Sequence, residues 1–302
     1  MVTGSSGFIG SNLVNTLRSN AMDVRAIARE NRPDTESIKS YGPETDWSQQ
    51  LKGVDCIVHL AARVHVMRET ASDPMEAFRQ ANFHSTLNLA RQAALSGTRR
   101  FIFVSTIKVN GERTAEGLPF TAASPPNPLD PYAISKFEAE QELFALGAST
   151  GMEVTVVRPP LVYGPGVGGN FRLLMKWAKI GFPSVFAKFK NKRSMIFVEN
   201  LTDLLRVAIH HPNAANRAFV ASDNETLSTH DILNQLITAY GKKPISVPLP
   251  IATIRFAGKI LNREQAVLRL TENLEVDSSE TTQILGWQPP ISNDHGLRKT
   301  IA

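Results

Sequence analysis

Two side chains four residues apart, Tyr132 and Lys136, could carry out acid–base chemistry. At the start of a predicted helix, this spacing projects both side chains from the same face. A phenol with a pKa of about 10 exchanges protons poorly at neutral pH, whereas a neighbouring ammonium favours the phenolate and lowers that pKa. The same ammonium could hydrogen-bond a ribose. The alternative is a surface tyrosine beside a surface lysine, so the neighbouring sequence has to be considered.

Two hydroxyl-bearing residues, Ser105 and Thr106, follow an apolar run that begins at Phe101. This run predicts a strand buried on both faces of a parallel sheet. Ligands of open α/β sheets bind at the carboxyl ends of the strands. We therefore expect the Thr106 hydroxyl to lie at one site with Tyr132 and Lys136, which favours a functional pair over an accidental one.

Three glycines near the N-terminus, Gly4, Gly7 and Gly10, could bind a pyrophosphate. They follow a very short apolar lead and open a predicted helix, whose N-terminus offers free N–H groups and the positive end of its dipole. Glycine permits the tight turn and the close approach of backbone to phosphate. The spacing G-x-x-G-x-x-G differs from the G-x-G-x-x-G of ordinary dinucleotide dehydrogenases. Only three residues precede Gly4, so a shortened central strand is expected.

The residue after the second predicted strand bears on which dinucleotide binds. NAD sites usually carry a carboxylate there, which holds the ribose 2′-OH. Here the strand over residues 24–28 is followed by Arg29, which could pair with a 2′-phosphate, with help from Arg32. Glu30 lies between them, and Arg29 could equally be a solvated surface residue. We expect NADP or NAD, with NADP favoured.

The elements that position these residues alternate in type. Strands are predicted over residues 24–28, 55–62, 101–106 and 154–158, and helices over 11–20, 77–96, 132–146, 171–179, 198–210 and 229–240. This alternation predicts an α/β fold with a Rossmann-type, doubly wound parallel sheet covered by helices on both faces. Residues 252–261 form a further amphipathic stretch, which could lie on a membrane surface, although a core-facing helix is commoner.

The composition excludes several classes of protein. The 302 residues include one cysteine, Cys56, so a disulfide framework is excluded, and its apolar surroundings predict a buried core thiol. Apolar residues are 42% and charged residues 20%, which excludes wholesale disorder. No apolar run is long enough to span a membrane, and no signal peptide is apparent, so a soluble cytoplasmic protein is expected. The net charge of +5 fits nucleic acid or an anionic small substrate, but no nucleic-acid motif and no metal site are predicted.

Taken together, these features resemble the extended short-chain dehydrogenase/reductase family, the group that contains nucleotide-sugar epimerases, dehydratases and reductases. The matching segments are residues 3–10, 59–62, 104–106, 132–136, 158–166 and 285–289. The resemblance implies a Rossmann domain over residues 1–162, with a returning segment at about 194–222. It implies a smaller C-terminal α/β substrate domain over residues 163–193 and 223–302. By analogy with the family, helices 77–96 and 132–146 could form a homodimer face.

The resemblance also implies roles for individual residues. Tyr132 would be the acid/base, Lys136 its pKa-lowering and ribose-binding partner, and Thr106 the hydroxyl that binds the reacting oxygen. The expected cofactor-binding residues are Gly4, Gly7, Phe8, Ile9, Gly10, Arg29, Asp46, Trp47, Leu60, Ala61, Ala62, Asn82, Tyr132, Lys136 and Pro159. The expected substrate-binding residues are Arg63, Lys108, Asn170 and Arg193. His65 would line the sugar site or be an ordinary polar residue.

The residues after Thr106 bear on the reaction. Dehydratases of this family follow the threonine with Asp-Glu, whereas Ile107 and Lys108 stand here, which disfavours dehydration. What remains is hydride transfer at C4 of a UDP-sugar. The nearest subgroup resembles UDP-4-keto-6-deoxy-hexosamine 4-reductases of surface-polysaccharide synthesis, and Arg29 favours that reaction. The alternative is a UDP-glucose or UDP-N-acetylglucosamine 4-epimerase. A non-catalytic NAD(P)-sensing protein is a third reading, disfavoured because the Tyr132 and Lys136 pair is intact.

Overall fold

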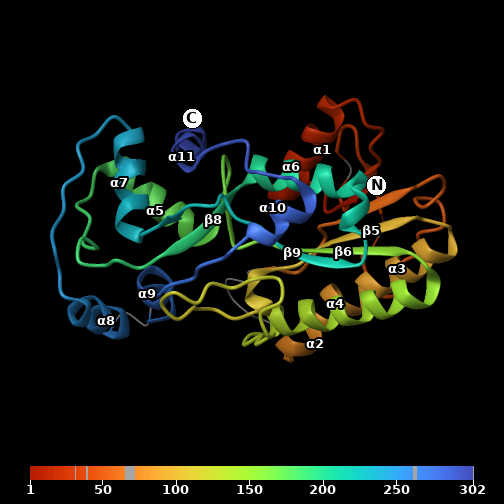
Figure 1. Cartoon of the computed structure of the whole chain (residues 1–302), viewed down its shortest axis with the longest axis horizontal. Helices are drawn as coiled ribbons and strands as arrows, with labels where there is room; N and C mark the ends of the chain where they lie inside the picture. The colour runs from red at the N-terminus through yellow and green to blue at the C-terminus, as the bar shows by residue number, and fades with distance from the viewer. Residues whose placement is uncertain (31, 39, 65–71, 261–263, 302) are drawn as a thin grey trace.

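The computed structural model describes residues 1–30, 32–38, 40–64, 72–260 and 264–301. A large sheet with helices on both faces forms one end of the molecule, and a smaller lobe of helices around a short sheet forms the other (Figure 1). The fold is the predicted α/β arrangement. Within the described residues, no helix is both long enough and apolar enough to cross a membrane, and no group of residues is arranged to hold a metal ion.

The large sheet has seven parallel strands, whose order is β3-β2-β1-β4-β5-β6-β9. Their bounds are β1 Val2–Thr3, β2 Ala26–Ala28, β3 Glu36–Ser37, β4 Cys56–His59, β5 Arg100–Val104, β6 Glu153–Arg158 and β9 Arg217–Val220. The chain runs outward from β1 to one edge and then from β4 to the other, so the order reverses between β1 and β4. A doubly wound sheet opens a ligand crevice at this switch point.

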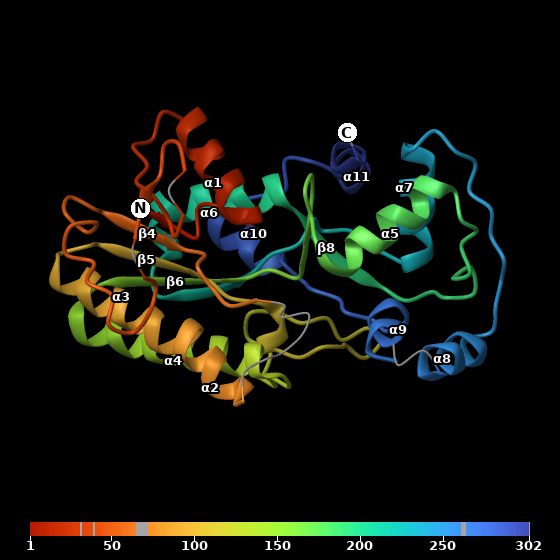
Figure 2. The same cartoon turned by 180° about the vertical axis from the view of Figure 1, so that it is seen from behind.

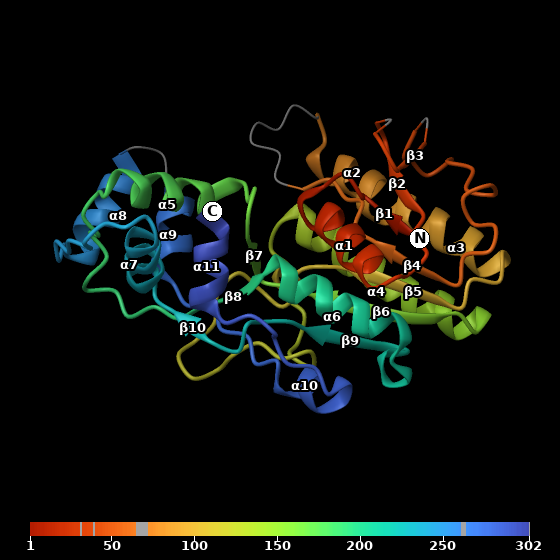
Figure 3. The same ribbon diagram turned by 90° about the horizontal axis from the view of Figure 1, so that it is seen from above.

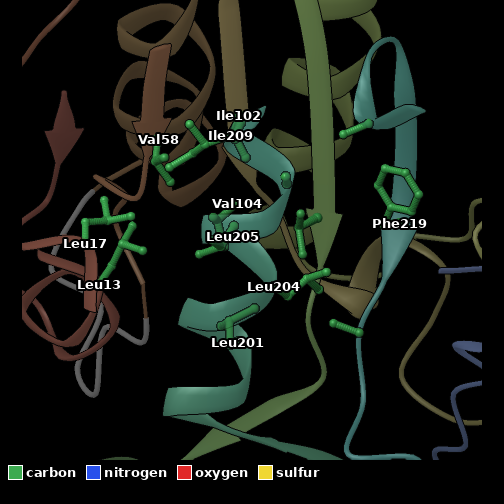
Figure 4. Close-up of a cluster of buried hydrophobic side chains, with 14 of the residues drawn as sticks. Leu13, Leu17, Val58, Ile102, Val104, Leu201, Leu204, Leu205, Ile209 and Phe219 are labelled. Atoms are coloured by element: carbon green, nitrogen blue, oxygen red, sulfur yellow. The ribbon is translucent and has the colours of Figure 1, made fainter. Parts of the chain in front are cut away.

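Helices cover both faces of this sheet. Helices α1 (Phe8–Ser19) and α6 (Val198–His210) lie on one face, where leucines of both helices meet valines and isoleucines of β4 and β5 (Figure 4). Helices α3 (Ser85–Leu95) and α4 (Pro131–Thr150) lie on the other face, over Phe101, Phe103 and the apolar side chains of β6 (Figure 2). Successive strand residues point to opposite faces, so β4 and β5 are apolar except at one end of each, where β4 ends with His59 and β5 begins with Arg100.

The predicted helix over residues 77–96 is longer and less regular than expected. It consists of α2 (Pro74–Arg79), a π turn over Gln80–His84 and α3. Asp73 accepts a hydrogen bond from the backbone N–H of Glu76 and so caps the first turn. A π turn inserts one extra residue into a helix and frequently marks a functional site. Here it carries the fully buried Asn82.

The smaller lobe contains a three-stranded sheet of order β10-β8-β7. Its strands are β7 Leu161–Tyr163, β8 Arg193–Phe197 and β10 Thr226–Leu227, and its helices are α5 Gly169–Ile180, α7 Thr229–Ala239, α8 Ile251–Ile260, α9 Glu264–Thr271 and α11 Asn293–Ile301 (Figure 3). Helix α10 (Ser279–Leu285) packs beside β9. The chain therefore passes to the smaller sheet and back before it supplies β9. The domain boundaries expected at 162, 194 and 222 stay a prediction.

Several local expectations differ from the structure. Helix α1 begins at Phe8 rather than Ser11, because the third glycine, Gly10, lies inside the first helical turn. The strand expected over residues 55–62 ends at His59, and residues 60–64 leave the sheet. Cys56 is only partly buried as a residue, yet desolvation of its thiol raises the pKa of that thiol to about 11. It is therefore an unreactive thiol at neutral pH.

Candidate active site

A cavity of about 1110 Å³ lies at the carboxyl ends of β1, β2, β4 and β5 and extends to the smaller lobe. It is lined at one end by the glycine turn and at the other by residues of α5, β8 and α9. Most predicted site residues line it: Gly4, Gly7, Phe8, Ile9, Gly10, Arg29, Trp47, Leu60, Ala61, Ala62, Arg63, Lys108, Tyr132, Lys136, Pro159, Asn170 and Arg193. Asp46, Asn82 and Thr106 do not. His65 lies outside the described residues.

The glycine turn is packed too closely for side chains. A Cβ atom at Gly10 would lie 2.1 Å from the carbonyl oxygen of Gly4, and one at Gly4, whose φ is +67°, would lie 2.7 Å from the Ala61 nitrogen. Gly7 is the N-cap of α1, and no side chain caps that end. The first turn therefore presents bare backbone N–H groups to the cavity, an arrangement that fits the pyrophosphate of a dinucleotide.

The end of β4 is held against this turn by a buried imidazole. His59 Nδ1 lies 2.7 Å from the Thr3 hydroxyl, and its Nε2 lies 3.0 Å from Thr86 and 3.1 Å from the Tyr41 hydroxyl. Burial, and then the charge of Lys136, lower the pKa of His59 to about 3. The neutral ring therefore acts as a fixed hydrogen-bonding spacer between β1 and α3, and it sets the path of the cavity-lining residues 60–62.

Tyr132 lies in the first turn of α4, whose N-cap is Asp130. The Asp130 carboxylate accepts a hydrogen bond of 2.7 Å from the Ala133 nitrogen. Burial, and then the charge of Asp130, raise the pKa of the Tyr132 phenol, whereas the Thr106 hydroxyl, which hydrogen-bonds the phenol, lowers it. Thr106 also accepts a 3.3 Å hydrogen bond from the Lys108 nitrogen. With its oxygen accepting there, the hydroxyl is free to donate its proton toward the phenol or a substrate oxygen.

Lys136 is almost completely buried beside the cavity. Its ammonium donates a 2.8 Å hydrogen bond to the Val104 carbonyl and lies 4.1 Å from the centre of the Phe103 ring. Burial lowers the pKa of Lys136 to about 7, against the opposing effect of Glu140 one turn later. Glu140 is itself paired with the buried Arg158 at 2.6 Å. Of the three predicted catalytic residues, Tyr132 and Lys136 thus line the cavity, and Thr106 lies behind them, hydrogen-bonded to the Tyr132 phenol.

Asn82 does not line the cavity, but its hydrogen bonds position residues of the cavity wall. Its side-chain oxygen accepts a 2.7 Å hydrogen bond from the Arg63 nitrogen, and its amide nitrogen donates to the Arg63 carbonyl and to the Ser135 hydroxyl, both at 3.1 Å. Ser135 directly precedes Lys136. The π turn therefore ties the loop after β4 to the helix that carries Tyr132. Asn82 holds the cavity wall in place from behind.

The end of the cavity near β2 contains Arg29 and Trp47. Arg29 is exposed and follows the last residue of β2, while Glu30 pairs with Arg32 at 3.2 Å. Trp47 is fully buried, and its backbone nitrogen donates to the Gln92 side chain. Asp46 is exposed, outside the cavity lining, and accepts from the Ser48 nitrogen, which lowers the pKa of its carboxyl. The Trp47 indole thus forms part of the wall.

At the far end of the cavity, two arginines lie near each other. Burial, and then the charge of Arg269 on α9, lower the pKa of Arg193 to about 10, which keeps Arg193 charged at neutral pH. Both line the cavity, as does Asn170 in the first turn of α5. Two neighbouring cations of this kind can attract a multiply charged anion such as a diphosphate. Sequence reasoning missed Arg269, because an isolated arginine on a short helix carries no local signal.

Comparison with known proteins gives consistent results. The model of the NAD dependent epimerase/dehydratase family matches residues 1–221. A UDP-glucose 4-epimerase of Vibrio cholerae is 41% identical over 306 residues, covering 99% of this chain and 93% of that protein. Among solved structures, a UDP-N-acetylglucosamine 4-epimerase of Bacillus cereus superposes with a TM-score of 0.79 at 20% identity, covering 98% of this chain and 95% of the other. A Thermotoga maritima UDP-glucose 4-epimerase with UDP-glucose gives 0.77 at 21%, covering 99% and 96%.

Proposed function

The chain belongs to the NAD dependent epimerase/dehydratase family, and we propose that it interconverts UDP-sugars that differ in configuration at C4. The observation that carries this proposal is one continuous cavity. A pyrophosphate-binding turn, the Thr106–Tyr132–Lys136 group and the Arg193–Arg269 pair all adjoin it. The relative that is 41% identical over almost the whole chain is named a UDP-glucose 4-epimerase, which supports epimerisation more than net reduction.

The residues divide the chemistry between them. A bound dinucleotide, held at its pyrophosphate by the glycine turn, would supply a reversible hydride acceptor for C4. Tyr132, as phenolate, removes the proton from the O4 hydroxyl, and Thr106 donates a hydrogen bond to that oxygen. After the C4 ketone has turned in the cavity, Tyr132 returns the proton to O4. Lys136, as ammonium, favours the phenolate electrostatically. Arg193 and Arg269 hold the diphosphate while the sugar turns.

A second candidate is the net reduction of a UDP-4-keto-6-deoxy-hexosamine, and Arg29 is the observation that favours it. An arginine at the end of β2 suits the 2′-phosphate of NADP, the usual donor for net reductions. In that reaction Tyr132 donates its proton to O4 as hydride arrives at C4. The acid–base residues are the same in both reactions, so they do not distinguish them.

One experiment separates the two reactions. The purified protein is mixed with UDP-glucose or UDP-N-acetylglucosamine, and separately with a UDP-4-keto-6-deoxy-hexosamine and NADPH. Interconversion of the C4 epimers without net loss of NADPH supports the epimerase. Stoichiometric NADPH loss that requires the keto sugar supports the reductase. Failure of both reactions, with Tyr132→Phe equally inactive, would reject C4 hydride chemistry altogether.

Two further expectations are part of this proposal. Helices α2 and α4 meet through a bidentate ion pair between Arg79 and Glu138, in which the shortest N–O distance is 2.6 Å. By family analogy, this face would bind a second copy of the chain.

The proposed substrates, UDP-sugars for bacterial surface polysaccharides, are consistent with the predicted cytoplasmic location.

A further inference from the structure

The basic residues of this chain are distributed unevenly. No acidic residue occurs between Glu153 and Glu199, or between Asp231 and Glu264. These two intervals contain Arg158, Arg172, Lys176, Lys179, Lys188, Lys190, Lys192, Arg193, Lys242, Lys243, Arg255, Lys259 and Arg263. Because the whole chain has 33 Lys and Arg against 28 Asp and Glu, the remainder of the chain is net acidic. The modest net charge of +5 therefore conceals two regions of opposite sign.

The fold brings the two acid-free intervals together. The Ser184 nitrogen donates to the Ile245 carbonyl at 2.7 Å, and the Val247 nitrogen donates to the Ser184 carbonyl at 2.9 Å. The Lys242 ammonium donates to the Lys179 carbonyl at the end of α5. Helix α8 follows directly, and these segments form the end of the smaller lobe that lies farthest from the seven-stranded sheet (Figures 1 and 3).

Large apolar side chains are exposed among these cations. They are Ile180 (68% exposed), Phe182 (46%), Ile245 (57%), Val247 (41%), Phe256 (66%) and Ile260 (65%). On α8, Ile254 packs against the core of the lobe, whereas Phe256 and Ile260, one turn apart, remain outside. Exposed cations accompany them at Lys179, Lys188, Lys190, Lys242, Lys243 and Lys259. We call these six apolar residues and six lysines the distal surface.

We propose that the distal surface docks on an anionic phospholipid membrane. An exposed helix with aromatic and aliphatic side chains beside lysines is the pattern of a protein that lies in a membrane interface. The apolar groups enter the headgroup region, while the lysine stems extend and keep their ammonium groups at the phosphates. Nucleic acid would use the charge but leave six apolar side chains in water. Binding of an acidic protein partner would not require lysines spread over so broad a surface.

Docking in this way leaves the active site unobstructed. None of the six apolar residues of the distal surface is among the residues that line the cavity. The Lys242 and Lys243 side chains are likewise outside it. Membrane attachment is therefore separable from turnover of a UDP-sugar in solution. The inference does not depend on which C4 reaction the protein catalyses.

The test is flotation of the protein with phospholipid vesicles in a density gradient. Vesicles of phosphatidylcholine with about one third phosphatidylglycerol are compared with pure phosphatidylcholine, at low and high salt. We expect binding to the anionic vesicles, weakening as salt rises. Lys242→Glu/Lys243→Glu should lower the partition coefficient at least about 25-fold, since each lysine near an anionic surface contributes about fivefold. Phe256→Ser/Ile260→Ser should also weaken binding, with little dependence on salt.

A matched control carries the same charge change at the opposite end of the molecule. Lys52→Glu/Arg91→Glu replaces two exposed cations near β4 and on α3, and it should reduce binding much less than Lys242→Glu/Lys243→Glu. Turnover of UDP-sugar and the melting temperature report that each variant is folded. The proposal is overturned by absence of vesicle binding, by equal binding to neutral vesicles, or by an equal loss in the control. Binding to single-stranded nucleic acid in preference to vesicles would also overturn it.

Discussion

The Lys108 ammonium lies 2.5 Å from the carboxylate of Asp130, the N-cap of the helix that carries Tyr132. The same ammonium lies 2.9 Å from Glu112. Asp130 raises the pKa of the Tyr132 phenol, so the cation beside Asp130 offsets that effect. Lys108 was expected to bind substrate, and it does line the cavity. We infer from its ion pairs that Lys108 influences the pKa of Tyr132, the proposed acid/base, through Asp130.

Removal of the Lys108 charge should lower the fraction of Tyr132 that is phenolate at a given pH. Against the opposing effect of burial, Lys108 and then Arg269 on α9 lower the pKa of the Asp130 carboxyl, so both cations face Asp130. In Lys108→Gln, Asp130 is no longer offset by its closest cation, and the pKa of Tyr132 rises further. The limb of the pH profile of kcat/KM that requires phenolate should move up by about one pH unit. Steady-state kinetics with a UDP-sugar measure this shift.

The double variant Lys108→Gln/Asp130→Asn tests that route. Asparagine caps a helix about as well as aspartate but carries no charge. The double variant should therefore titrate like Asp130→Asn alone. If the upward shift persists in the double variant, Lys108 does not act through Asp130. A double-mutant cycle over the two single variants and the double variant measures the coupling between Lys108 and Asp130 directly.

Loss of the Tyr132 hydroxyl should abolish turnover but leave binding intact. A positioned acid or base contributes about 10²- to 10⁴-fold to rate, so Tyr132→Phe should lower kcat by at least about 100-fold. Dinucleotide affinity should change by less than about threefold, because the glycine turn and Arg29 are untouched. Stopped-flow or coupled assays give kcat, and fluorescence titration gives Kd. Turnover near the wild-type rate would reject the role proposed for Tyr132.

The buried Lys136 should make stability depend on pH. Its pKa is lowered to about 7 in the folded protein, below its value in the unfolded chain, so the unfolded chain binds more protons between these two values. The free energy of unfolding should therefore rise with pH from about 7 toward 10. Relative to Lys136→Met, the wild-type protein should gain on the order of 2 kcal/mol between pH 7 and 9. Denaturant titrations without dinucleotide or UDP-sugar measure this, and parallel pH curves for the two proteins would contradict it.

Arg29 should decide between the two dinucleotides. Arg29→Asp places a carboxylate at the end of β2, which repels a 2′-phosphate and can accept from a ribose 2′-OH. We expect the Kd for NADP to rise at least about tenfold, while the Kd for NAD stays equal or falls. Arg32→Asp is the matched control, because Arg32 pairs with Glu30 and is outside the cavity lining. If both substitutions change the Kd values of both dinucleotides equally, Arg29 does not distinguish the 2′-phosphate of NADP from the 2′-OH of NAD.

Arg269 should bind substrate as strongly as Arg193. Loss of either cation removes an attraction to the diphosphate that is the same before and during reaction, so KM should rise at least about tenfold with a smaller effect on kcat. Arg269→Met and Arg193→Met test this with UDP-sugar, and the product UDP serves as a competitive probe. Arg172→Met is the control, since this exposed arginine on α5 lies outside the cavity lining. An unchanged KM in Arg269→Met would exclude that residue from the diphosphate site.

The sequence predicted those parts of the site whose chemistry depends on local spacing. The glycine turn and the Tyr132–Lys136 pair each lie within one turn and its helix, so their geometry follows from residue spacing alone. Arg269 and the contacts of Asn82 depend on chain segments far apart in sequence, which only the tertiary fold brings together. Strands β3 and β10 have two residues each, too few to show an alternating pattern. The π turn at Gln80–His84 likewise has no sequence pattern distinct from that of an ordinary helix.

The late position of β9 in the chain has a consequence during synthesis. β6 pairs with β5 on one side and with β9 on the other, and β9 is made only after the chain has built most of the smaller sheet. A nascent chain that ends before Arg217 therefore has an unpaired edge at β6 with Val154, Val156 and Val157 alongside. Such an edge is prone to pair with other chains. Ribosome-stalled or truncated forms lacking residues 217–220 should therefore aggregate and require chaperones, whereas β9 covers β6 once it has been made.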